Sequence, residues 1–232
     1  MKTLNILTLF PEFFRSPFET GLLSKFLQKG DLLLNLVDIR EFSDDSFKRC
    51  DDYPYGGGSG MVLKPEPLFK ALDSLDNRGT VILTSPSGEP LNQEKVKEFA
   101  GLEDITIICG HYEGVDQRVV DEYVDFEISV GDYVLSGGEF AALIITDAVV
   151  RYLPGFMSNP ESLVEESFEG SLLEYPHYTR PENFREHQVP SVLLSGNHAE
   201  IAKWRLNKRV EKTRRVRPDL YKQYEIIKEK QR

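Results

Sequence analysis

Cysteine, histidine and long apolar runs are all scarce in this chain of 232 residues. Its two cysteines cannot form a disulfide framework or a metal cluster by themselves, and its four histidines do not have the spacing of a metal site. No apolar run approaches the length of a membrane span. The N-terminus leads directly into an apolar segment, with no basic-then-apolar signal sequence. We therefore expect a cytoplasmic protein with no membrane contact and no dedicated metal site.

Two common catalytic motifs are also missing. The glycine run at 56–60 is not followed by Gly-Lys-Ser/Thr, which excludes a phosphate-binding P-loop. Met61 stands where a nucleophile elbow would have its last glycine. No Ser/His/Asp or Cys/His set is apparent, so the pattern does not indicate covalent catalysis. The run itself is either a flexible turn or part of a binding loop.

Charge is unevenly distributed along the chain. The net charge is −10, yet residues 170–232 hold 14 Lys and Arg against 8 Asp and Glu. Residues 1–169 therefore carry 14 basic and 30 acidic residues. A basic C-terminal part suggests a nucleic-acid surface, although charge alone could equally mark a solvated helix.

Apolar strand-like segments alternate with helix-like segments through the first two thirds of the chain. The strands are expected at 4–9, 32–39, 81–84, 105–109 and 126–130. The helices are expected at 18–28, 66–75, 93–100, 115–121 and 139–152, with a long loop at 40–60. This alternation predicts an α/β fold, with a parallel sheet covered by helices on both faces. The last helix is expected at 198–217, capped by Asn197 and ended by Pro218.

Glycine-rich loops follow three of the expected strands, at 84–88, 110–114 and 130–138. Glycine allows positive φ angles and lets a ligand approach the backbone closely. Ligands in open α/β sheets bind at the carboxyl ends of strands. These loops are therefore either ordinary turns between strands and helices or the walls of a ligand site.

The strings CGHYEGVDQRV and SVGDYVLSGGE in these loops make a family resemblance specific. Together with DDYPYGGGSGM, PHYTRP and PSVLLSGNHAEIAKWR, they resemble the bacterial tRNA (guanine-N(1)-)-methyltransferases of the SPOUT class. The strings occur in order over nearly the whole chain. The resemblance implies a trefoil knot at the end of the α/β domain and a homodimer whose active site uses both chains. It implies three parts: a knotted domain at 1–155 that binds adenosylmethionine, a flexible linker at 156–175, and a small helical domain at 176–232 that binds tRNA.

The resemblance also implies an activity. The family transfers a methyl group from S-adenosylmethionine to N1 of the guanosine at tRNA position 37, next to the anticodon, which supports reading-frame maintenance. The glycine loops would hold the donor, largely through backbone groups. The matched donor contacts are Pro86, Gly110, Tyr112, Gly114, Val130, Gly131, Tyr133, Val134, Leu135, Gly137 and Gly138. The resemblance suggests magnesium dependence as well.

Three residues match catalytic positions of the family. Glu166 falls at the general base, Arg151 at the arginine that stabilises the purine oxygen, and Glu113 at an acid near the reacting centre. The tRNA would be bound by the glycine-rich loop and by the C-terminal domain. The candidates are Asp51, Asp52, Gly58, Gly60, His177, Tyr178, Arg180, Lys208, Arg209 and Lys212.

The chain departs from the family pattern at several positions. The general base is usually aspartate, whereas Glu166 is one methylene longer. His111 and Gln117 stand where the family usually has arginine and glutamate. Two alternatives stay open: another SPOUT RNA methyltransferase, such as a ribose 2′-O enzyme, and a tRNA-binding protein without activity. The retained acid at 166, Arg151 and the glycines favour an active enzyme.

Overall fold

The computed structural model describes residues 2–157 and 166–230. The chain divides into two compact units, Met1–Ser158 and Asn159–Arg232. Within the described residues, no helix is both long enough and apolar enough to cross a bilayer.

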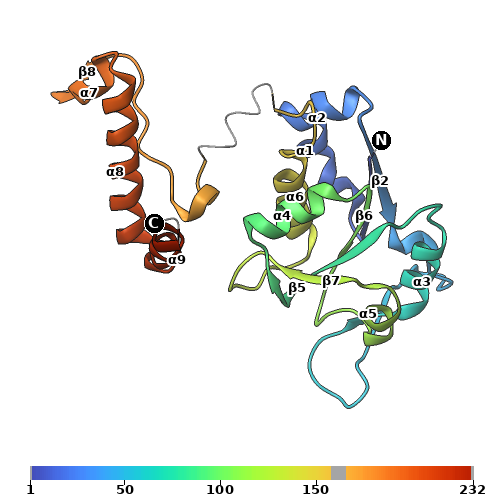
Figure 1. Ribbon diagram of the computed structural model, residues 1–232. Coiled ribbons are helices and arrows are strands. Elements are labelled where there is room, and N and C mark those ends of the chain that lie inside the picture. Colours follow the sequence, from blue (N-terminus) through green and yellow to red (C-terminus); the bar gives the residue numbers. More distant parts are fainter. Residues whose placement is uncertain (1, 158–165, 231–232) are drawn as a thin grey trace. The chain divides into compact units, whose positions relative to one another are not determined.

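The first unit is built on a five-stranded sheet in the order β2-β1-β6-β5-β7 (Figure 1), and every pairing in it is parallel. Its strands are rich in apolar residues, as expected for a sheet buried on both faces. The strands are β1 (Lys2–Thr8), β2 (Leu32–Asp38), β5 (Thr80–Pro90), β6 (Asp104–Cys109) and β7 (Phe126–Ser129). The predicted parallel α/β architecture is therefore confirmed. β5 is longer than predicted, because it continues through the expected loop at 84–88, where its pairing with β7 is irregular between Thr84 and Glu89.

Helices cover both faces of this sheet. Alternate residues of a strand point to opposite faces, so Ile6 and Leu7 of β1 belong to two different core clusters. The cluster around Ile6 contains residues of α1 (Arg15–Glu19), α2 (Gly21–Gln28), α4 (Gln93–Gly101) and α6 (Glu139–Val150). The cluster around Leu7 contains residues of α3 (Pro65–Asp73) and α5 (Gln117–Tyr123).

The predicted helix over 18–28 is wrong in one respect. Thr20 has extended backbone angles, with φ −127° and ψ 157°, and separates α1 from α2. Its hydroxyl donates to the carbonyl of Ser16 at 2.8 Å, which closes the end of α1. The apolar spacing continued across this break, so periodicity alone could not locate it.

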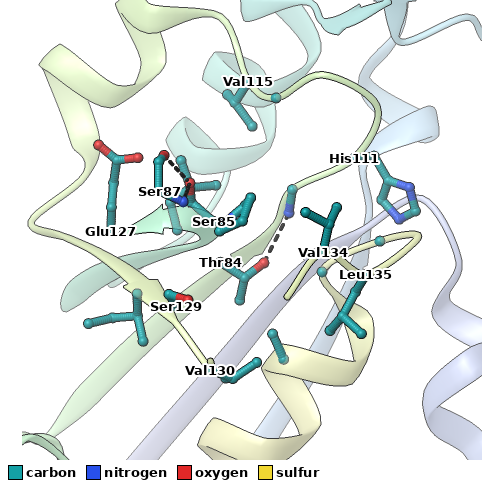
Figure 2. A pocket seen from close by; sticks show the side chains of 18 of the residues that line it. Thr84, Ser85, Ser87, His111, Val115, Glu127, Ser129, Val130, Val134 and Leu135 are labelled. Carbon is teal, nitrogen blue, oxygen red and sulfur yellow. Dashed lines mark hydrogen bonds between the residues drawn. The ribbon is translucent and has the colours of Figure 1, made fainter. Parts of the chain in front are cut away.

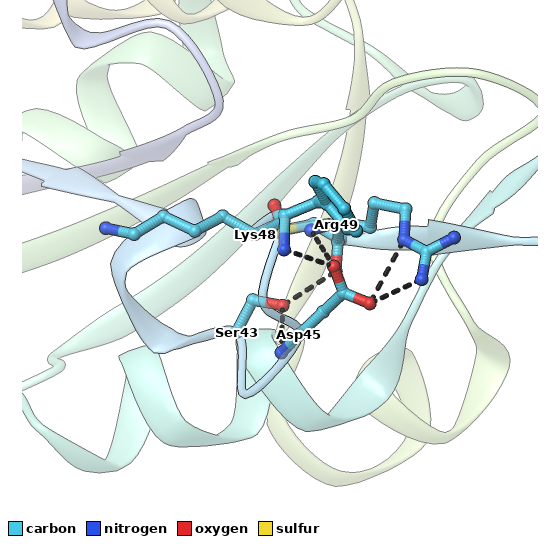
Figure 3. A network of polar contacts seen from close by, with 6 residues as sticks. Ser43, Asp45, Lys48 and Arg49 are labelled. Atoms are coloured by element: carbon cyan, nitrogen blue, oxygen red, sulfur yellow. Dashed lines mark hydrogen bonds and ion pairs between the residues drawn. The ribbon is translucent and has the colours of Figure 1, made fainter.

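The predicted loop over 40–60 contains ordered structure. A short 3-10 helix, η2 (Ile39–Phe42), opens the loop. Another 3-10 helix, η1 (Pro11–Phe14), lies earlier in the chain, between β1 and α1. Asp45 then organises the tip (Figure 3), because its carboxylate accepts from the backbone of Phe47 at 2.8 Å and from Nε of Arg49 at 3.0 Å. The Arg49 side chain lowers the pKa of Asp45 well below its usual range. A two-stranded ribbon of β3 (Asp51–Asp52) and β4 (Val62–Leu63) follows.

The second unit consists mainly of helices. Asn197 caps α8 as predicted, with its side chain accepting from the backbone of Glu200 at 3.3 Å. Pro218 does not simply end the helical structure. Arg217 has non-helical angles, and Pro218 begins a further helix that the sequence reading missed. The elements are η4 (Glu169–Ser171), β8 (Asn183–Phe184), β9 (His187–Gln188), α7 (Ser191–Leu194), α8 (His198–Val216) and α9 (Pro218–Lys230).

Both ends of the predicted linker at 156–175 are packed. Phe156 is buried in the core of the first unit. Leu172 and Leu173 are buried, and the backbone N–H of Leu173 donates to the Thr213 hydroxyl of α8 at 2.8 Å. Residues 158–165, the middle of the predicted linker, lie outside the described residues, so for them flexibility stays a prediction.

Candidate active site

A pocket of about 290 Å³ lies at the carboxyl ends of β6 and β7 and beside the part of β5 where pairing with β7 is irregular, between Thr84 and Glu89. Figure 2 shows its lining, with Thr84, Ser85 and Ser87 from one segment and Ser129 and Val130 from another. The three loops expected to bind a ligand, at 84–88, 110–114 and 130–138, contribute most of the wall. The predicted meeting of these loops at one edge of the sheet is confirmed.

Every residue predicted to contact the donor lines this pocket, and so does Glu113. The walls combine glycines with apolar side chains such as Val130, Val134 and Leu135. Their contact with a donor stays a prediction. Sequence reasoning did not name several other lining residues, although five of them fall within the loops expected to bind a ligand. These are Leu83, Thr84, Ser85, Ser87, His111, Val115, Gln117, Val120, Glu127, Ile128, Ser129, Ser136 and Ala141.

Thr84 could have been found from its position. It is a polar residue that directly follows an apolar stretch of β5, and its side chain binds β5 to the end of β6. Its hydroxyl donates to the carbonyl of Ile108 at 3.2 Å and accepts from the backbone N–H of Gly110 at 3.1 Å (Figure 2). The pocket floor is therefore fixed by a buried side chain as well as by the sheet.

Gly138 is required by close packing of backbone against backbone. Its N–H donates to the carbonyl of Gly110 at 2.8 Å. A Cβ added to Gly138 would lie 2.1 Å from Oγ1 of Thr84 and 2.6 Å from the nitrogen of Gly110. No side chain fits there, so the turn before α6 can approach the end of β6 only because residue 138 is glycine.

Beneath this turn lies a buried polar group formed by Thr8, His111 and Glu139. Nε2 of His111 lies 2.8 Å and 2.7 Å from the two carboxylate oxygens of Glu139, and the Thr8 hydroxyl donates to Oε1 at 2.7 Å. Burial alone would raise the pKa of Glu139, but the hydrogen bonds from His111 and Thr8 outweigh it and lower the pKa. Burial also raises the pKa of the neighbouring Cys109 thiol well above its ordinary value.

The predicted substrate loop meets the pocket at Glu113. The backbone N–H of Glu113 donates to the carbonyl of Met61 at 3.0 Å, and a Cβ on Gly60 would lie 2.4 Å from Oε1 of Glu113. Gly58 has a φ of +124° and no atom within 4 Å of an added Cβ. The structure thus brings Gly60 and Glu113 together, as their predicted roles require.

The two aspartates of this loop lie in β3, where Asp51 pairs with Leu63 and Asp52 with Val62. Burial raises the pKa of Tyr112, and the negative charge of Asp51 raises it further. Tyr112 itself has a left-handed φ of +61°, which is uncommon for a residue with a side chain. Asp51 is therefore electrostatically coupled to a residue that lines the pocket.

The remaining candidates divide between the two units. Arg151 caps the C-terminus of α6 in the first unit, as predicted. In the second unit, Glu166 is half-buried and Nε2 of His177 lies 2.7 Å from Glu174. Tyr178 packs beside Trp204, with ring centroids 6.3 Å apart, and Arg180 is exposed.

The three basic candidates of α8 differ in their surroundings. Nζ of Lys208 donates to Glu211 at 2.8 Å, and Nε of Arg209 donates to the carbonyl of Leu173 at 3.3 Å. Lys212 is exposed. Arg209 therefore helps to hold the segment that follows Glu166, a structural role that the sequence reading did not anticipate.

Comparison with known proteins agrees with this geometry. The family model described as "tRNA (Guanine-1)-methyltransferase TrmD" matches residues 1–223. A tRNA (guanine-N(1)-)-methyltransferase of Treponema denticola is 57% identical over 217 residues, covering 93% of this chain and 89% of the relative. Proteins of the same name from Borrelia turicatae and Caldanaerobacter subterraneus are 54% and 50% identical, covering 95% and 97% of this chain and 93% and 94% of the relatives. The chain therefore belongs to the tRNA (guanine-1)-methyltransferase family.

Proposed function

We propose that this protein transfers the methyl group of S-adenosylmethionine to N1 of the guanosine at tRNA position 37, and so supports reading-frame maintenance. The observation that carries the proposal is the pocket formed by the three glycine loops, in a chain 57% identical to a tRNA (guanine-N(1)-)-methyltransferase. Proteins that act on tRNA work where tRNA is found, so we place this one in the cytoplasm.

The pocket suits the methyl donor chemically. An adenosine moiety requires apolar walls for its ring and backbone groups for its polar edge, and the pocket offers both. The space beside Gly114 is open, because an added Cβ would meet no atom within 4 Å. When bound, S-adenosylmethionine would supply an electrophilic methyl group on a sulfonium. The residues of the chain would bind it and orient it.

Three side chains would act on the guanine. We assign the general base to Glu166, which takes the proton from N1 while the bond from sulfur to the methyl carbon breaks and the bond from N1 to that carbon forms. Arg151 would stabilise the negative charge that develops on the purine oxygen. Glu113, held against Met61 and Gly60, would orient the base. Asp51, Asp52 and Gly58 would contact the substrate from the same loop.

The assignment of Glu166 can be tested directly. Glu166→Gln keeps the size of the side chain but removes the proton acceptor, so the single-turnover rate should fall about a hundredfold or more. Glu166→Asp, the commoner family residue, should keep substantial activity. Glu165→Gln is the matched control and should react at nearly the wild-type rate. A fully active Glu166→Gln enzyme with an inactive Glu165→Gln enzyme would move the base by one residue.

The trefoil knot of the SPOUT class is part of the proposal. Its support is the close packing of chain segments at the pocket. Gly138 packs against Thr84 and Gly110, while β5 pairs with β7 both before and after residues 85–88. A chain segment that passes through a loop would need close backbone packing of this kind.

A homodimer with a shared active site is also proposed. The first unit exposes large apolar side chains in one region, and Phe13 packs edge-to-face on Phe140 at 4.8 Å. Phe10, Phe13, Phe140 and Ile144 are 46%, 36%, 51% and 44% exposed. Apolar groups gathered in this way commonly mark an interaction surface, and a second copy of the chain is the partner that the family implies. The exposure of these four apolar side chains supports the proposed dimer.

Magnesium is assigned no residue. Among residues 2–157 and 166–230, no three His, Cys, Asp or Glu side chains gather in a way that could hold a metal ion. The tRNA itself would be bound by the exposed and basic residues of the second unit: His177, Tyr178, Arg180, Lys208, Arg209 and Lys212.

A further inference from the structure

Glu139 is the most deeply buried carboxylate beside the pocket, at 4% exposure, and no proposed step of the reaction uses it. It is the first residue of α6 and follows directly on the turn that lines the donor pocket. A buried carboxylate is costly unless donors surround it. Here the donors are Thr8 and His111, which come from the ends of two other strands.

The hydrogen bonding fixes the orientation of His111. An ionised carboxylate can only accept, so Nε2 of His111 must carry the proton that it shares with Glu139. Thr8 Oγ1 donates to Glu139 and accepts from the backbone N–H of Phe10 at 2.9 Å. The ring of Phe10 in turn lies against His111, with centroids 5.3 Å apart. Thr8, Glu139 and His111 therefore restrain one another.

The imidazole ring of His111 supports the donor turn. A Cβ added to Gly137 would lie 2.3 Å from Cε1 and 2.6 Å from Nε2 of His111, so the backbone of Gly137 rests closely on the ring. Gly137 belongs to the segment 133–138 that lines the pocket. Any displacement of the ring would therefore be transmitted to that wall.

We propose that Glu139 is a positioning residue, which holds the Gly137–Gly138 turn in its donor-binding shape through His111 and Thr8. The proposal rests on the proposed function, because it assigns the turn to S-adenosylmethionine. Glu139 contacts neither donor nor guanine in this account. Its effect should be seen in the donor's affinity and KM, because the preformed turn is a feature of donor binding rather than of the methyl transfer itself.

Two substitutions of His111 separate positioning from general packing. Gln places a side-chain N–H close to where Nε2 of His111 lies, so His111→Gln keeps a hydrogen bond to Glu139. His111→Leu fills similar space but removes the hydrogen bond from residue 111 to the Glu139 carboxylate. We expect His111→Leu to raise the donor KM and the dissociation constants of S-adenosylmethionine and S-adenosylhomocysteine by about tenfold or more. His111→Gln should recover most of that loss, and kcat at saturating donor should fall by less than about threefold in both.

Hydrogen exchange of the free protein provides a readout that does not depend on catalysis. In His111→Leu, the amide of Gly138, which donates to Gly110, should exchange faster, whereas amides of β1 should keep their protection. Thr8→Val removes the hydrogen bond from Thr8 to Glu139 with little change of shape and should show the same pattern more weakly. Thr8→Val therefore provides the test if the His111→Leu protein does not fold.

The outcomes distinguish this inference from the proposed function. Failure of the wild-type protein to bind either adenosyl compound in calorimetry would overturn the proposed function. Wild-type binding with unchanged donor KM in both His111→Leu and Thr8→Val would overturn the positioning role. Equal losses in His111→Leu and His111→Gln would also overturn it, because the effect would then follow from packing and not from the hydrogen bond to Glu139.

Discussion

At the scale of single residues, Gly137 and Gly138 are adjacent but would meet different atoms if substituted. A methyl group on Gly137 would strike the side chains of His111 and Glu139, which can shift. A methyl group on Gly138 would strike the backbone of Gly110 and Cys109 as well as Thr84. The first change should therefore act on the pocket, and the second on the fold.

Alanine substitutions test this difference. Gly137→Ala should fold and bind S-adenosylmethionine at least about tenfold more weakly, because the side chain displaces the ring that supports the turn. Gly101→Ala is the matched control, since a Cβ there meets no atom within 4 Å. Calorimetry and thermal melting of both proteins would decide. Unchanged donor affinity in a folded Gly137→Ala protein would remove this turn from the donor site.

The pH dependence of stability follows from Glu139. Its pKa in the folded protein is lowered from an ordinary value of 4.5, so the unfolded chain takes up the proton first as the pH falls. The stabilisation is present above pH 4.5 and is lost as the pH falls through the folded pKa. Glu139→Gln should therefore be less stable than the wild type at pH 7, and the difference should shrink toward pH 4. Urea unfolding across this range measures it. A difference that does not change with pH would contradict the assignment.

Every residue that the sequence predicted to contact the donor lies on the wall of the pocket, although the pocket has other lining residues that were not named. It did not predict the Thr8–His111–Glu139 group. These three residues are far apart in sequence, and only the parallel order of β1 and β6 brings their ends together. No local pattern encodes such a contact, because it depends on which strands become neighbours.

At the scale of elements, the strands were located correctly because each contains an apolar core, but the end of β5 was not, since β5 continues to Pro90 through residues predicted as a loop. Helix boundaries were predicted less accurately where a residue type can either begin or end a helix. Proline fits the first turn of a helix as well as the end of one, and Pro218 begins α9 immediately after α8 ends. The break at Thr20 depends on backbone angles and a side-chain hydrogen bond that apolar spacing does not report.

The structure also improves the choice of residues for testing α8. Arg209 supports the backbone at Leu173 and Lys208 pairs with Glu211, so replacing either would disturb more than charge. Lys203, Lys212 and Arg215 are exposed cations on the same helix. Replacing these three with glutamine should weaken tRNA binding and lower its salt slope by about one unit for each lost phosphate contact.

Filter binding at several salt concentrations would measure that slope. Donor affinity should stay at the wild-type value, because these residues belong to the second unit and the pocket to the first. A triple variant with the wild-type salt slope would show that α8 presents a solvated basic face and does not contact phosphates.

At the scale of the whole molecule, acidic and basic residues are separated between the two parts of the chain. Residues 1–169, with 14 basic and 30 acidic residues, contain the pocket, whereas residues 170–232, with 14 basic and 8 acidic residues, contain α8. This division fits an enzyme that binds a small cationic donor in one unit and a polyanionic RNA through the other. Net charge alone, at −10, would have argued against an RNA partner.

The most direct test of the account is to map the methylated atom. Unmodified tRNA carrying guanosine at position 37 would be incubated with the protein and S-adenosylmethionine, then digested and analysed by mass spectrometry against nucleoside standards. The account predicts 1-methylguanosine at position 37, none from a transcript with adenosine there, and formation at least about a hundredfold slower with the Glu166→Gln protein. A methyl group on a ribose 2′-oxygen, or no methyl transfer by a wild-type protein that binds both donor and tRNA, would contradict it.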